Sequence, residues 1–544
     1  MTYVVTQACC NDATCVAVCP VNCIHPTPDE AQYARTEMLY IDPNTCIDCG
    51  ACADVCPVEA IVPDSDLTSD TEIYKDLNAA YFLGNPTVSG PSEVPREPVV
   101  VAERPGPLRV AIVGSGPSAF YAAEELLARR DIDVEVSMFE RLHVAGGLVR
   151  FGVAPDHQTT KAVERVFART AGRNGFRAFL GVEVGRDISV DELLDHHHAV
   201  IHASGASDDR KLGIPGEDLP GSFAAREFVA WYNGHPDYAG RQFDLSGRRA
   251  VVIGNGNVAL DVARILARDP EFLVPGDIAE HALDVLRRSA IDEVVVLGRR
   301  GPEHGAFTTP ELLALGSLPE VDVTVHGGYE APAGASIKLQ TIEEYARRTP
   351  QPGRKRITLR FLGSPVEVLG HDHVEGLRIS RYGEEGVAED LECSLVLRSV
   401  GYRGRPIPGL PFDDGRGTVP NVAGRVIDAA LDRPIPGLYV AGWIKRGPSG
   451  VIGTNRYCAA ETVGAIVADH ERALLPSPSR SGDELTAIVA SRCPDSFGFD
   501  GWKRIDRHER TEGRRRGRAR RKLVEVDAML AVARGADVNR HLPQ

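Results

Sequence analysis

The sequence predicts a small cysteine-rich α+β domain followed by a larger part made of two α/β domains, and three observations carry this prediction. Nine of the twelve cysteines lie within the first 56 of 544 residues. A proline-rich stretch follows, with six prolines between residues 85 and 107. Beyond it, an apolar strand, a glycine-rich turn and a helical pattern occur twice, in "LRVAIVGSGPSAFYAAEELL" and "RRAVVIGNGNVALDVARIL". At roughly 150 residues per domain, the length suits three or four domains.

The later cysteine run, "CIDCGACADVCP", has the spacing Cys-x2-Cys-x2-Cys-x3-Cys-Pro that is typical of bacterial ferredoxins. In that pattern the first three thiolates hold one iron–sulfur cluster and the fourth holds another. Structural zinc usually takes two separated pairs of Cys or His, and disulfides are rare in the cytosol, so both explanations are disfavoured. The run therefore predicts a two-cluster electron carrier with the metal ligands Cys46, Cys49, Cys52 and Cys56.

The earlier run, "CCNDATCVAVCPVNC", repeats the end of this pattern from Cys15 onward. Cys19 is expected to complete the [4Fe-4S] cluster of the later run, whereas Cys56 joins Cys9 and Cys15 at the other cluster. Three ligands favour a [3Fe-4S] cluster; a second [4Fe-4S] cluster would need Cys10 as its fourth ligand. The run resembles seven-iron ferredoxins, but it is about two residues shorter between its first and second ligands. The choice between Cys9 and Cys10 therefore stays open.

The first glycine-rich turn has the pattern of a dinucleotide-binding site. Gly114 and Gly116 permit a tight turn and a close approach to a pyrophosphate, and Ala119 lets the helix pack on the strand. The following strand, "VEVSMFE", ends at Glu140, which can accept hydrogen bonds from ribose hydroxyls. The order of strand, turn, helix and terminal acid predicts that this region binds a dinucleotide.

The second turn places Gly254 and Gly256 between a strand and a helix in the same way. Its later strand, "EVVVLGRRG", ends in Arg299 and Arg300, where the first site has Glu140. A carboxylate would repel a 2′-phosphate, whereas guanidinium groups bind it through paired hydrogen bonds. The second site is therefore predicted to bind NADP and the first to bind FAD.

From about residue 107 onward the chain resembles adrenodoxin reductase and its bacterial ferredoxin–NADP reductase relatives. The matching stretches occur in the family's order and include "GGLVRFGVAPDHQTTK", "VIHASGA", "LGRRGP", "TTPEL" and "GLYVAGWIKRGPSGVIGTNR". With its cysteine-rich head, the whole chain resembles the fused ferredoxin/ferredoxin–NADP reductases. This resemblance implies an α+β two-cluster ferredoxin domain followed by an α/β two-domain Rossmann-like flavoprotein. The expected boundaries are a ferredoxin domain at 1–76, a linker at 77–107, an FAD-binding domain at 108–210 and 430–544, and an NADP-binding domain at 211–429.

The resemblance also implies the residues of each site. Those expected around FAD are Gly114, Gly116, Ala119, Glu140, Leu148, Val184, Trp443, Gly450, Val451 and Ile452. Those expected around NADP are Arg210, Gly254, Asn255, Gly256, Asn257, Val258, Arg299, Arg300 and Glu311, with Gly450 close to the nicotinamide. The implied catalytic residues are His157 and Glu311, although a hydrogen-bonded core histidine would explain His157 equally well.

The activity implied by the resemblance is that of an NADPH:ferredoxin oxidoreductase. A hydride passes from NADPH to FAD, and single electrons pass through the clusters to an acceptor protein such as a ferredoxin or a monooxygenase, or in the reverse direction. One alternative is an electron-transfer subunit of a larger complex, like the small subunit of glutamate synthase. Another is an electron-carrier module whose reductase part is vestigial.

Charge and composition restrict the kinds of partner that are expected. Residues 1–76 hold thirteen Asp and Glu against Arg35 and Lys75, a formal charge of −11 out of −15 for the chain, which favours a basic protein partner over nucleic acid. Residues 503–522 carry +8 and are expected to form either a solvated helix or a docking surface for the acidic head. The segment 271–290 is expected to be a helical insertion of unassigned role. No apolar run reaches the roughly 18 residues of a membrane span and no signal peptide is visible, so a cytoplasmic location without membrane insertion is expected.

Overall fold

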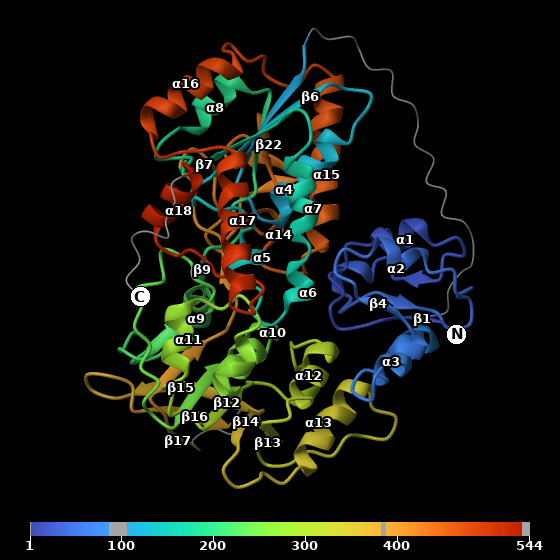
Figure 1. Cartoon of the computed structure of the whole chain (residues 1–544), viewed down its shortest axis with the longest axis vertical. Coiled ribbons are helices and arrows are strands. Elements are labelled where there is room, and N and C mark those ends of the chain that lie inside the picture. The colour runs from blue at the N-terminus through green and yellow to red at the C-terminus, as the bar shows by residue number, and fades with distance from the viewer. Residues whose placement is uncertain (1, 86–105, 382–387, 536–544) are drawn as a thin grey trace.

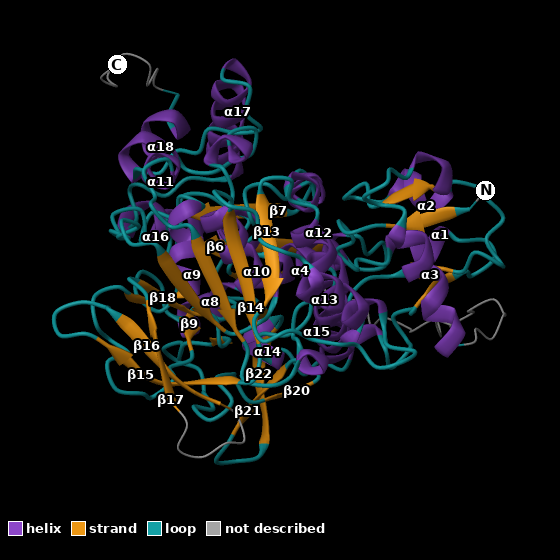
Figure 2. Cartoon of the chain, turned by 90° about the horizontal axis from the view of Figure 1, so that it is seen from below, coloured by secondary structure: helices purple, strands orange, loops and turns teal. Residues whose placement is uncertain are grey.

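The computed structural model describes residues 2–85, 106–381 and 388–535 (Figure 1). Most of the expected proline-rich linker, residues 86–105, lies outside this described part. The head, residues 2–84, packs against one side of a larger body formed by two sheet-containing domains, as Figures 1 and 2 both show. None of the helices in the described ranges combines the length and apolar character needed to cross a bilayer.

The described part of the head is built from two short two-stranded sheets and three α-helices. Strand β1 pairs antiparallel with β4, and β2 with β3. The elements are β1 (Tyr3–Val5), α1 (Thr14–Val18), β2 (Ile24–His25), η1 (Tyr33–Arg35), β3 (Tyr40–Ile41), α2 (Ala51–Val55), β4 (Ile61–Pro63), η2 (Asp64–Asp66) and α3 (Ile73–Gly84).

Helix α3 belongs to the head and corrects the expected boundary at residue 76. Its buried Asn78 side chain accepts hydrogen bonds from the backbone N–H of Val5 at 3.2 Å and of Ile41 at 2.9 Å, and donates to the Val5 carbonyl at 2.9 Å. A buried amide that satisfies backbone groups of two strands fixes the helix to the sheet. The head therefore extends to Gly84, and the segment 77–84 is helix rather than linker.

The first large domain is organised around a seven-stranded sheet of order β20-β21-β22-β8-β5-β6-β7, with β22 to β7 parallel. Val110 and Ile112 of β5 face the core formed with α4, α7 and α15, whereas Ala111 faces the core that contains residues of α8 and α16. Both faces are covered, so the strands are apolar throughout. The elements are β5 (Leu108–Val113), α4 (Pro117–Leu127), β6 (Val134–Glu140), α5 (Leu148–Phe151), α6 (Gln158–Lys161), α7 (Glu164–Ala171), β7 (Phe176–Leu180), α8 (Val190–His196), β8 (Ala199–His202), β20 (Asn421–Val422), β21 (Arg425–Asp428), β22 (Arg433–Val440), α14 (Trp443–Arg446), α15 (Thr454–Glu471), α16 (Gly482–Arg492), α17 (Phe499–Arg515) and α18 (Val526–Ala533).

The second large domain has a six-stranded parallel sheet of order β10-β18-β11-β12-β14-β13. Alternate residues of β11 face opposite ways: Val252 packs on the helices, and Val251 packs on a three-stranded antiparallel sheet. The elements are β10 (Ser222–Ala224), α9 (Ala225–Tyr232), β11 (Arg249–Ile253), α10 (Asn257–Ala267), η3 (Pro270–Leu273), α11 (Glu280–Leu286), β12 (Glu293–Leu297), η4 (Pro302–His304), α12 (Thr309–Gly316), β13 (Val321–Val325), α13 (Ile337–Arg347), β14 (Lys355–Arg360), β15 (Gly363–Leu369), β16 (Gly376–Arg381), β17 (Ala388–Glu392) and β18 (Leu395–Arg398).

The two large domains are joined where β9 (Asp208–Asp209) pairs antiparallel with β19 (Tyr402–Arg403). After this crossing the chain re-enters the first domain earlier than residue 430, because Val419 and Val426 are already buried in its core. Strands β20 and β21 also precede that position. The first domain therefore resumes before Val419 rather than at 430.

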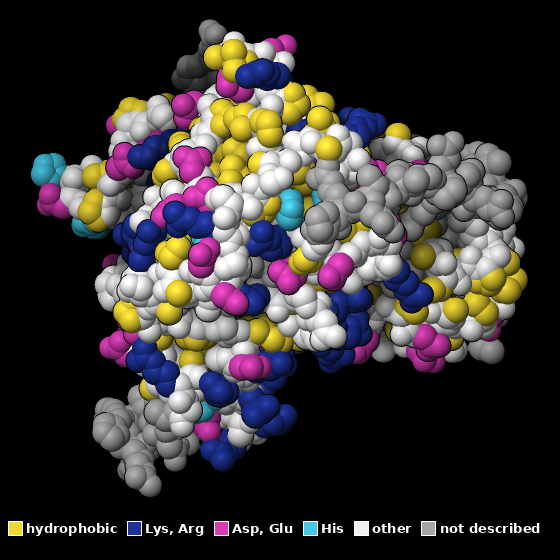
Figure 3. All heavy atoms as spheres, turned by 90° about the horizontal axis from the view of Figure 1, so that it is seen from above, with side chains coloured by type: hydrophobic (Ala, Val, Ile, Leu, Met, Phe, Trp, Pro, Cys, Tyr) yellow, Lys and Arg dark blue, Asp and Glu magenta, His cyan; other side chains and the backbone are white. Residues whose placement is uncertain are grey.

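The basic stretch 503–522 has a buried side as well as an exposed one. Glu509 on α17 is fully buried and pairs with Arg150 at 2.7 Å and with Arg520 at 2.7 Å. Its exposed Lys and Arg side chains gather over α17 at the lower edge of Figure 3, whereas the head lies at the right of that view. The stretch is therefore neither a simple solvated helix nor the docking surface for the head.

The segment 271–290 also has a structural role. Its Asp277 is buried and pairs with Lys161 at 2.7 Å and with Lys522 at 3.0 Å. Both lysines belong to the first large domain, whereas Asp277 lies in the second. The segment therefore fastens the two large domains together through buried charge.

We expect Glu509→Gln to lower the free energy of unfolding by about 3–5 kcal/mol, because it leaves buried guanidinium groups without their counter-charge. Burial would raise the pKa of Glu509, but the Arg150 and Arg520 guanidiniums outweigh it and lower that pKa to about 2. The contribution is therefore complete above the unfolded pKa of about 4.3 and is lost as the pH falls toward about 2. Thermal unfolding followed by circular dichroism measures the effect. Asp500→Asn on the same helix, where the carboxylate is 82% exposed, is the control, and equal losses from both variants would contradict the account.

Candidate functional site

A cavity of about 740 Å³ lies beside the first glycine-rich turn and the start of α10, the helix after the second turn, and it reaches the head. Its volume is within the range of about 300–1,000 Å³ that is usual for ligand sites. The expected site residues that line it are Gly114, Gly116, Glu140, Leu148, His157, Val184, Asn257, Val258, Glu311, Trp443, Gly450, Val451 and Ile452. The expected residues that do not line it are Ala119, Arg210, Gly254, Asn255, Gly256, Arg299 and Arg300.

The first turn follows from the close approach of two strand ends. Gly114 has a φ of +102°, and a Cβ atom there would lie 2.7 Å from the Ala203 carbonyl oxygen on the neighbouring strand end, so only glycine fits. Gly116 caps α4, whose first backbone N–H groups have no partner within the helix. Such a helix N-terminus beside a cavity suits a phosphate group.

Glu140 stands at the end of β6 and lines the same cavity. Its carboxylate accepts hydrogen bonds from the Ser115 backbone at 3.1 Å, the Ser115 hydroxyl at 2.7 Å and the Leu142 backbone at 2.9 Å. Burial raises the pKa of Glu140, and these hydrogen bonds oppose the rise. Because a carboxylate offers about four acceptor positions, Glu140 keeps capacity for a hydroxyl donor. The glycine turn, the helix end and this acceptor together fit a dinucleotide such as FAD.

The second turn repeats the first. Gly254 has a φ of +112°, and a Cβ atom there would lie 2.1 Å from the Ser399 carbonyl oxygen. Arg299 and Arg300 are exposed and follow β12, the strand next to β11 in the sheet. The turn that carries them lies beside Asn255, since a Cβ on Gly298 would be 2.7 Å from the Asn255 side-chain nitrogen. Both arginines thus stand at the carboxyl edge of the sheet, where parallel α/β sheets bind nucleotides.

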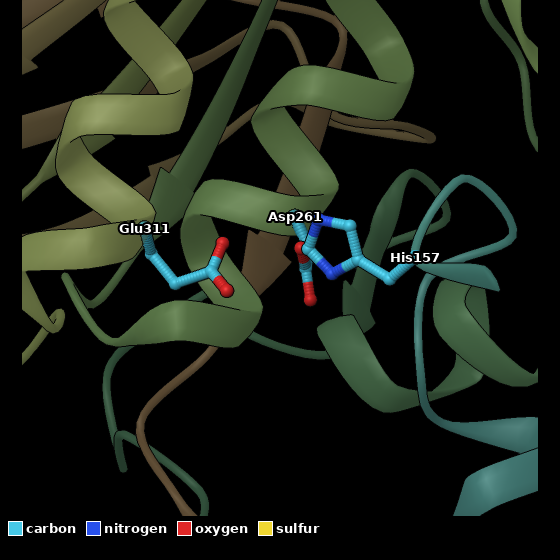
Figure 4. Close-up of side chains that lie close together, drawn as sticks. All are labelled: His157, Asp261 and Glu311. Atoms are coloured by element: carbon cyan, nitrogen blue, oxygen red, sulfur yellow. The ribbon is translucent and has the colours of Figure 1, made fainter. Parts of the chain in front are cut away.

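His157, Asp261 and Glu311 form a cluster in the cavity wall (Figure 4). One ligand-type atom from each lies within 4.8 Å of the others. The three side chains come from the start of α6, from α10 and from α12, and they point toward one another. Burial raises the pKa of Glu311, and the nearby His157 lowers it. The cluster can therefore share a proton between an imidazole and two carboxylates.

Sequence reasoning missed Asp261. It lies one helical turn after Asn257 on α10, so that spacing, which places both residues on the cavity side, was the available signal. Gln7 of the head also reaches the cluster, with its amide 3.4 Å from the Glu311 carboxylate.

In the head, one set of cysteines surrounds a small apolar cavity. The four cysteines expected to hold one cluster all line it, namely Cys19, Cys46, Cys49 and Cys52. The rest of the wall is formed by Cys23, Tyr3, Val21, Ile41, Ile47 and Gly50. Cys19 thus crosses from the earlier run to the later one, and four converging thiols around an apolar space fit a four-iron cluster. Cys23 lies beside it, with its sulfur 3.4 Å from that of Cys19.

The other expected set, Cys9, Cys15 and Cys56, is also brought together. Burial raises the pKa of the Cys15 thiol, and the nearby charges of Cys9 and Cys56 add to the rise. Cys10 differs from them: it is 4% exposed, packs in the core of the first large domain, and its carbonyl accepts from Gly453 N–H at 2.7 Å. Among the cysteines of the described head, only Cys9 and Cys10 line the large cavity.

The head contacts the body through charged and aromatic residues of α12, α13 and α15. Glu37 accepts from Lys338 at 2.6 Å and from the Thr309 backbone at 2.7 Å. The rings of Tyr33 and Tyr457 are 4.8 Å apart. Arg456 donates to the Thr14 hydroxyl at 2.8 Å. These contacts, rather than the basic stretch 503–522, form the docking face.

Comparison with known proteins agrees with this arrangement. Residues 39–62 match the model of the 4Fe-4S binding domain, and residues 108–288 match that of pyridine nucleotide-disulphide oxidoreductases. The chain is 50% identical over 549 residues to a probable ferredoxin/ferredoxin–NADP reductase of Mycobacterium leprae, covering 98% of each chain. It is 46% identical to the NADPH-ferredoxin reductase FprA of Mycobacterium tuberculosis, over 79% of this chain and 100% of that protein. The solved structure of that FprA in complex with NADPH superposes with a TM-score of 0.74 over the same 79% of this chain and 100% of that one.

Proposed function

The chain belongs to the family of ferredoxin/ferredoxin–NADP reductases, and from this premise we propose that it moves electrons between NADPH and an acceptor protein through clusters carried in its own head. The observation that carries the proposal is one cavity shared by three parts of the chain. It is lined by Gly114, Gly116 and Glu140 of the first nucleotide region, by Asn257 and Val258 on the helix after the second glycine turn, and by Cys9 and Cys10 of the head. Relatives that match over the full length bear the reductase name, which favours a complete enzyme over an accessory subunit.

Gly114, Gly116 and Glu140 hold FAD, and the turn at Gly254 with Arg299 and Arg300 holds NADPH. When bound, FAD accepts a hydride from NADPH and releases electrons singly, which is chemistry that the cofactor supplies. The protein's part is to orient the two nucleotides and to exclude water. Trp443 and the loop 450–452 supply the wall beside them.

The cluster of His157, Asp261 and Glu311 handles the proton that accompanies this exchange. Its three side chains lie in the cavity wall and point toward one another, and burial raises the pKa of Glu311. A carboxylate and an imidazole within hydrogen-bonding reach of a reacting group can take up or release its proton. His157 therefore has a role beyond that of a core histidine.

Cys9, Cys15 and Cys56 hold a [3Fe-4S] cluster beside the cavity, and Cys19, Cys46, Cys49 and Cys52 hold a [4Fe-4S] cluster farther out. A cluster held by the first set would lie nearer the cavity than one held by the second set, and both would supply one-electron transfer. The outer site is the more accessible, since Cys49 is exposed and Ile47 is 58% exposed. Exposed Asp48 and Asp54 give this end a negative surface, which suits a basic face on a ferredoxin- or monooxygenase-type partner.

Anaerobic reduction by NADPH tests the proposal. The flavin absorbance should bleach first, and the cluster EPR signals should change next. Chemical analysis of iron and acid-labile sulfide should correspond to seven irons per FAD. Flavin bleaching without any change at the clusters would contradict electron flow through the head.

The docking face gives a separate prediction. We expect Lys338→Glu to slow flavin-to-cluster transfer by about fivefold, because loss of a partly buried ion pair costs about 1 kcal/mol. Ferricyanide reduction by the flavin should not change. The charge-reversed double variant Lys338→Glu with Glu37→Lys should recover the rate, because it restores the pair. Arg514→Glu, on the exposed part of α17, is the matched control. If it slows flavin-to-cluster transfer as much as Lys338→Glu does, the head docks on the basic stretch 503–522 instead.

A further inference from the structure

The two cysteine runs of the head are in register over their whole length. Cys46 follows Cys9 by 37 positions, and the same interval relates Cys52 to Cys15 and Cys56 to Cys19. At that interval the counterpart of Cys49 is Asp12. Compared with the later run of the same chain, the earlier run therefore lacks no position and has aspartate in its second place.

The backbone confirms this register. Asn11 and Asp48, which precede the second position of each run, both adopt left-handed conformations, with φ of 57° and 59°. Helices α1 and α2 then each span five residues and begin after a left-handed residue, Ala13 in one case and Gly50 in the other. Left-handed non-glycine residues are uncommon, so their repetition at equal positions marks equivalent local folds.

The repetition continues to the sulfur atoms at the ends of the runs. Cys19 Sγ accepts from the backbone N–H four residues later at 3.4 Å, and Cys56 Sγ accepts from the backbone N–H four residues later at 3.2 Å. Asp12 thus occupies in the earlier run the backbone position that Cys49 occupies in the later run.

The surroundings of Asp12 fit a ligand. It is only 8% exposed. Its Oδ2 lies 3.7 Å from Arg456 Nη1. Its oxygens accept from the Thr14 backbone at 3.2 Å and from the Thr14 hydroxyl at 2.5 Å. Each oxygen has a second lone pair and can therefore also bind an iron.

Cys10 fits the same role poorly. Its side chain packs in the core of the first large domain, and its carbonyl is bonded to Gly453. It also adjoins Cys9 in sequence and therefore has no equivalent among the ligands of the later run.

We propose that Asp12 is the ligand for a fourth iron at the site formed by Cys9, Cys15 and Cys56, so that this site exchanges between three-iron and four-iron forms. The proposal rests on the function assigned above to those three thiols. Carboxylate is a harder ligand than thiolate and binds iron in sulfur clusters less firmly, which makes the fourth iron the removable one.

The exchange balances in charge and electrons. The oxidised three-iron core, of charge 1+, gains one electron from NADPH through the flavin and becomes neutral. The neutral core binds one Fe²⁺ and the Asp12 carboxylate to give a four-iron core of charge 2+. No further oxidant, reductant or proton is required.

The test uses the full chain, reduced with NADPH under anaerobic conditions and then given ⁵⁷Fe²⁺. We expect the wild-type chain to take up one iron per chain, to lose the EPR signal of the three-iron cluster on reoxidation by a mild oxidant, and to show a Mössbauer component typical of oxygen-ligated iron. Asp12→Asn should take up none and keep the three-iron signal. Asp12→Cys should hold eight irons as isolated, retain them in air, and lack the oxygen-ligated component.

Two controls isolate the ligand. Cys10→Ala should behave as wild type, and so should Asp48→Asn, which removes an exposed carboxylate next to Cys49. Iron uptake by Asp12→Asn with the wild-type Mössbauer spectrum, or its loss in Cys10→Ala, would overturn the proposal. A wild-type chain with a three-iron cluster that takes up no iron would also overturn it and leave the proposed function intact. Absence of any cluster change in Cys56→Ala would instead refute the underlying assignment of the thiols.

Discussion

Replacing Cys56 by alanine is expected to abolish delivery of electrons to protein acceptors while ferricyanide reduction by the flavin stays close to that of the parent chain. The Cys56 sulfur accepts from Ala60 N–H at 3.2 Å and lies with Cys9 and Cys15 at the site beside the large cavity. Its removal leaves two thiolates, too few to retain that cluster. The outer cluster then has no relay, because none of its four cysteines lines the cavity.

The measurement is NADPH-dependent reduction of cytochrome c, a basic protein, beside low-temperature EPR of the same sample. Cys23→Ala is the matched control, since Cys23 lies beside the outer cluster and is not assigned as a ligand. Unchanged cytochrome c reduction in a Cys56→Ala protein that has lost the three-iron signal would show that electrons bypass this cluster.

Removal of Arg299 or Arg300 is expected to raise the Michaelis constant for NADPH by about tenfold to hundredfold, with little effect on that for NADH. Each guanidinium would contribute a charge-assisted bond to the 2′-phosphate of roughly 1.5–3 kcal/mol. Both arginines are exposed at the end of β12, beside the turn of the second glycine motif, so their removal leaves the core intact.

Steady-state kinetics with both coenzymes measure this effect. Arg288→Ala removes an exposed arginine of the same domain away from that turn and is the control. Equal losses for NADPH and NADH in Arg299→Ala and Arg300→Ala would refute the assignment of these residues to the 2′-phosphate.

The parts of the fold that follow local rules were predictable from the sequence. Gly114 and Gly254 are required where two strand ends meet, and each is preceded by an apolar strand and followed by a helix. The spacing of the later cysteine run likewise predicts that Cys19 lies with the first three cysteines of that run. The small apolar cavity is lined by Cys19 together with Cys46, Cys49 and Cys52. In these cases the chemistry of a few neighbouring residues determines the geometry.

The parts that depend on distant partners could not be predicted. Helix α3 joins the head because Asn78 satisfies backbone groups some 37 to 73 residues away. Within 503–522, the buried Arg520 and Lys522 pair with Glu164 and Asp277, which lie more than 200 residues earlier in the chain. Asp261 acquires its place in the cluster only when α10 and α12 meet. The role proposed for Asp12, by contrast, follows from a comparison of the two cysteine runs with each other.

The central claim is that electrons pass from the flavin to the clusters within one chain. The most direct test mixes NADPH with increasing concentrations of the protein in an anaerobic stopped-flow instrument and records the rate constant for cluster reduction after flavin bleaching. The head is docked on the body, where the Gly453 N–H donates a hydrogen bond to the Cys10 carbonyl at 2.7 Å. This arrangement predicts a first-order rate constant that does not change with protein concentration. A rate that rises in proportion to protein concentration would mean that electrons move between separate molecules, and it would contradict the account.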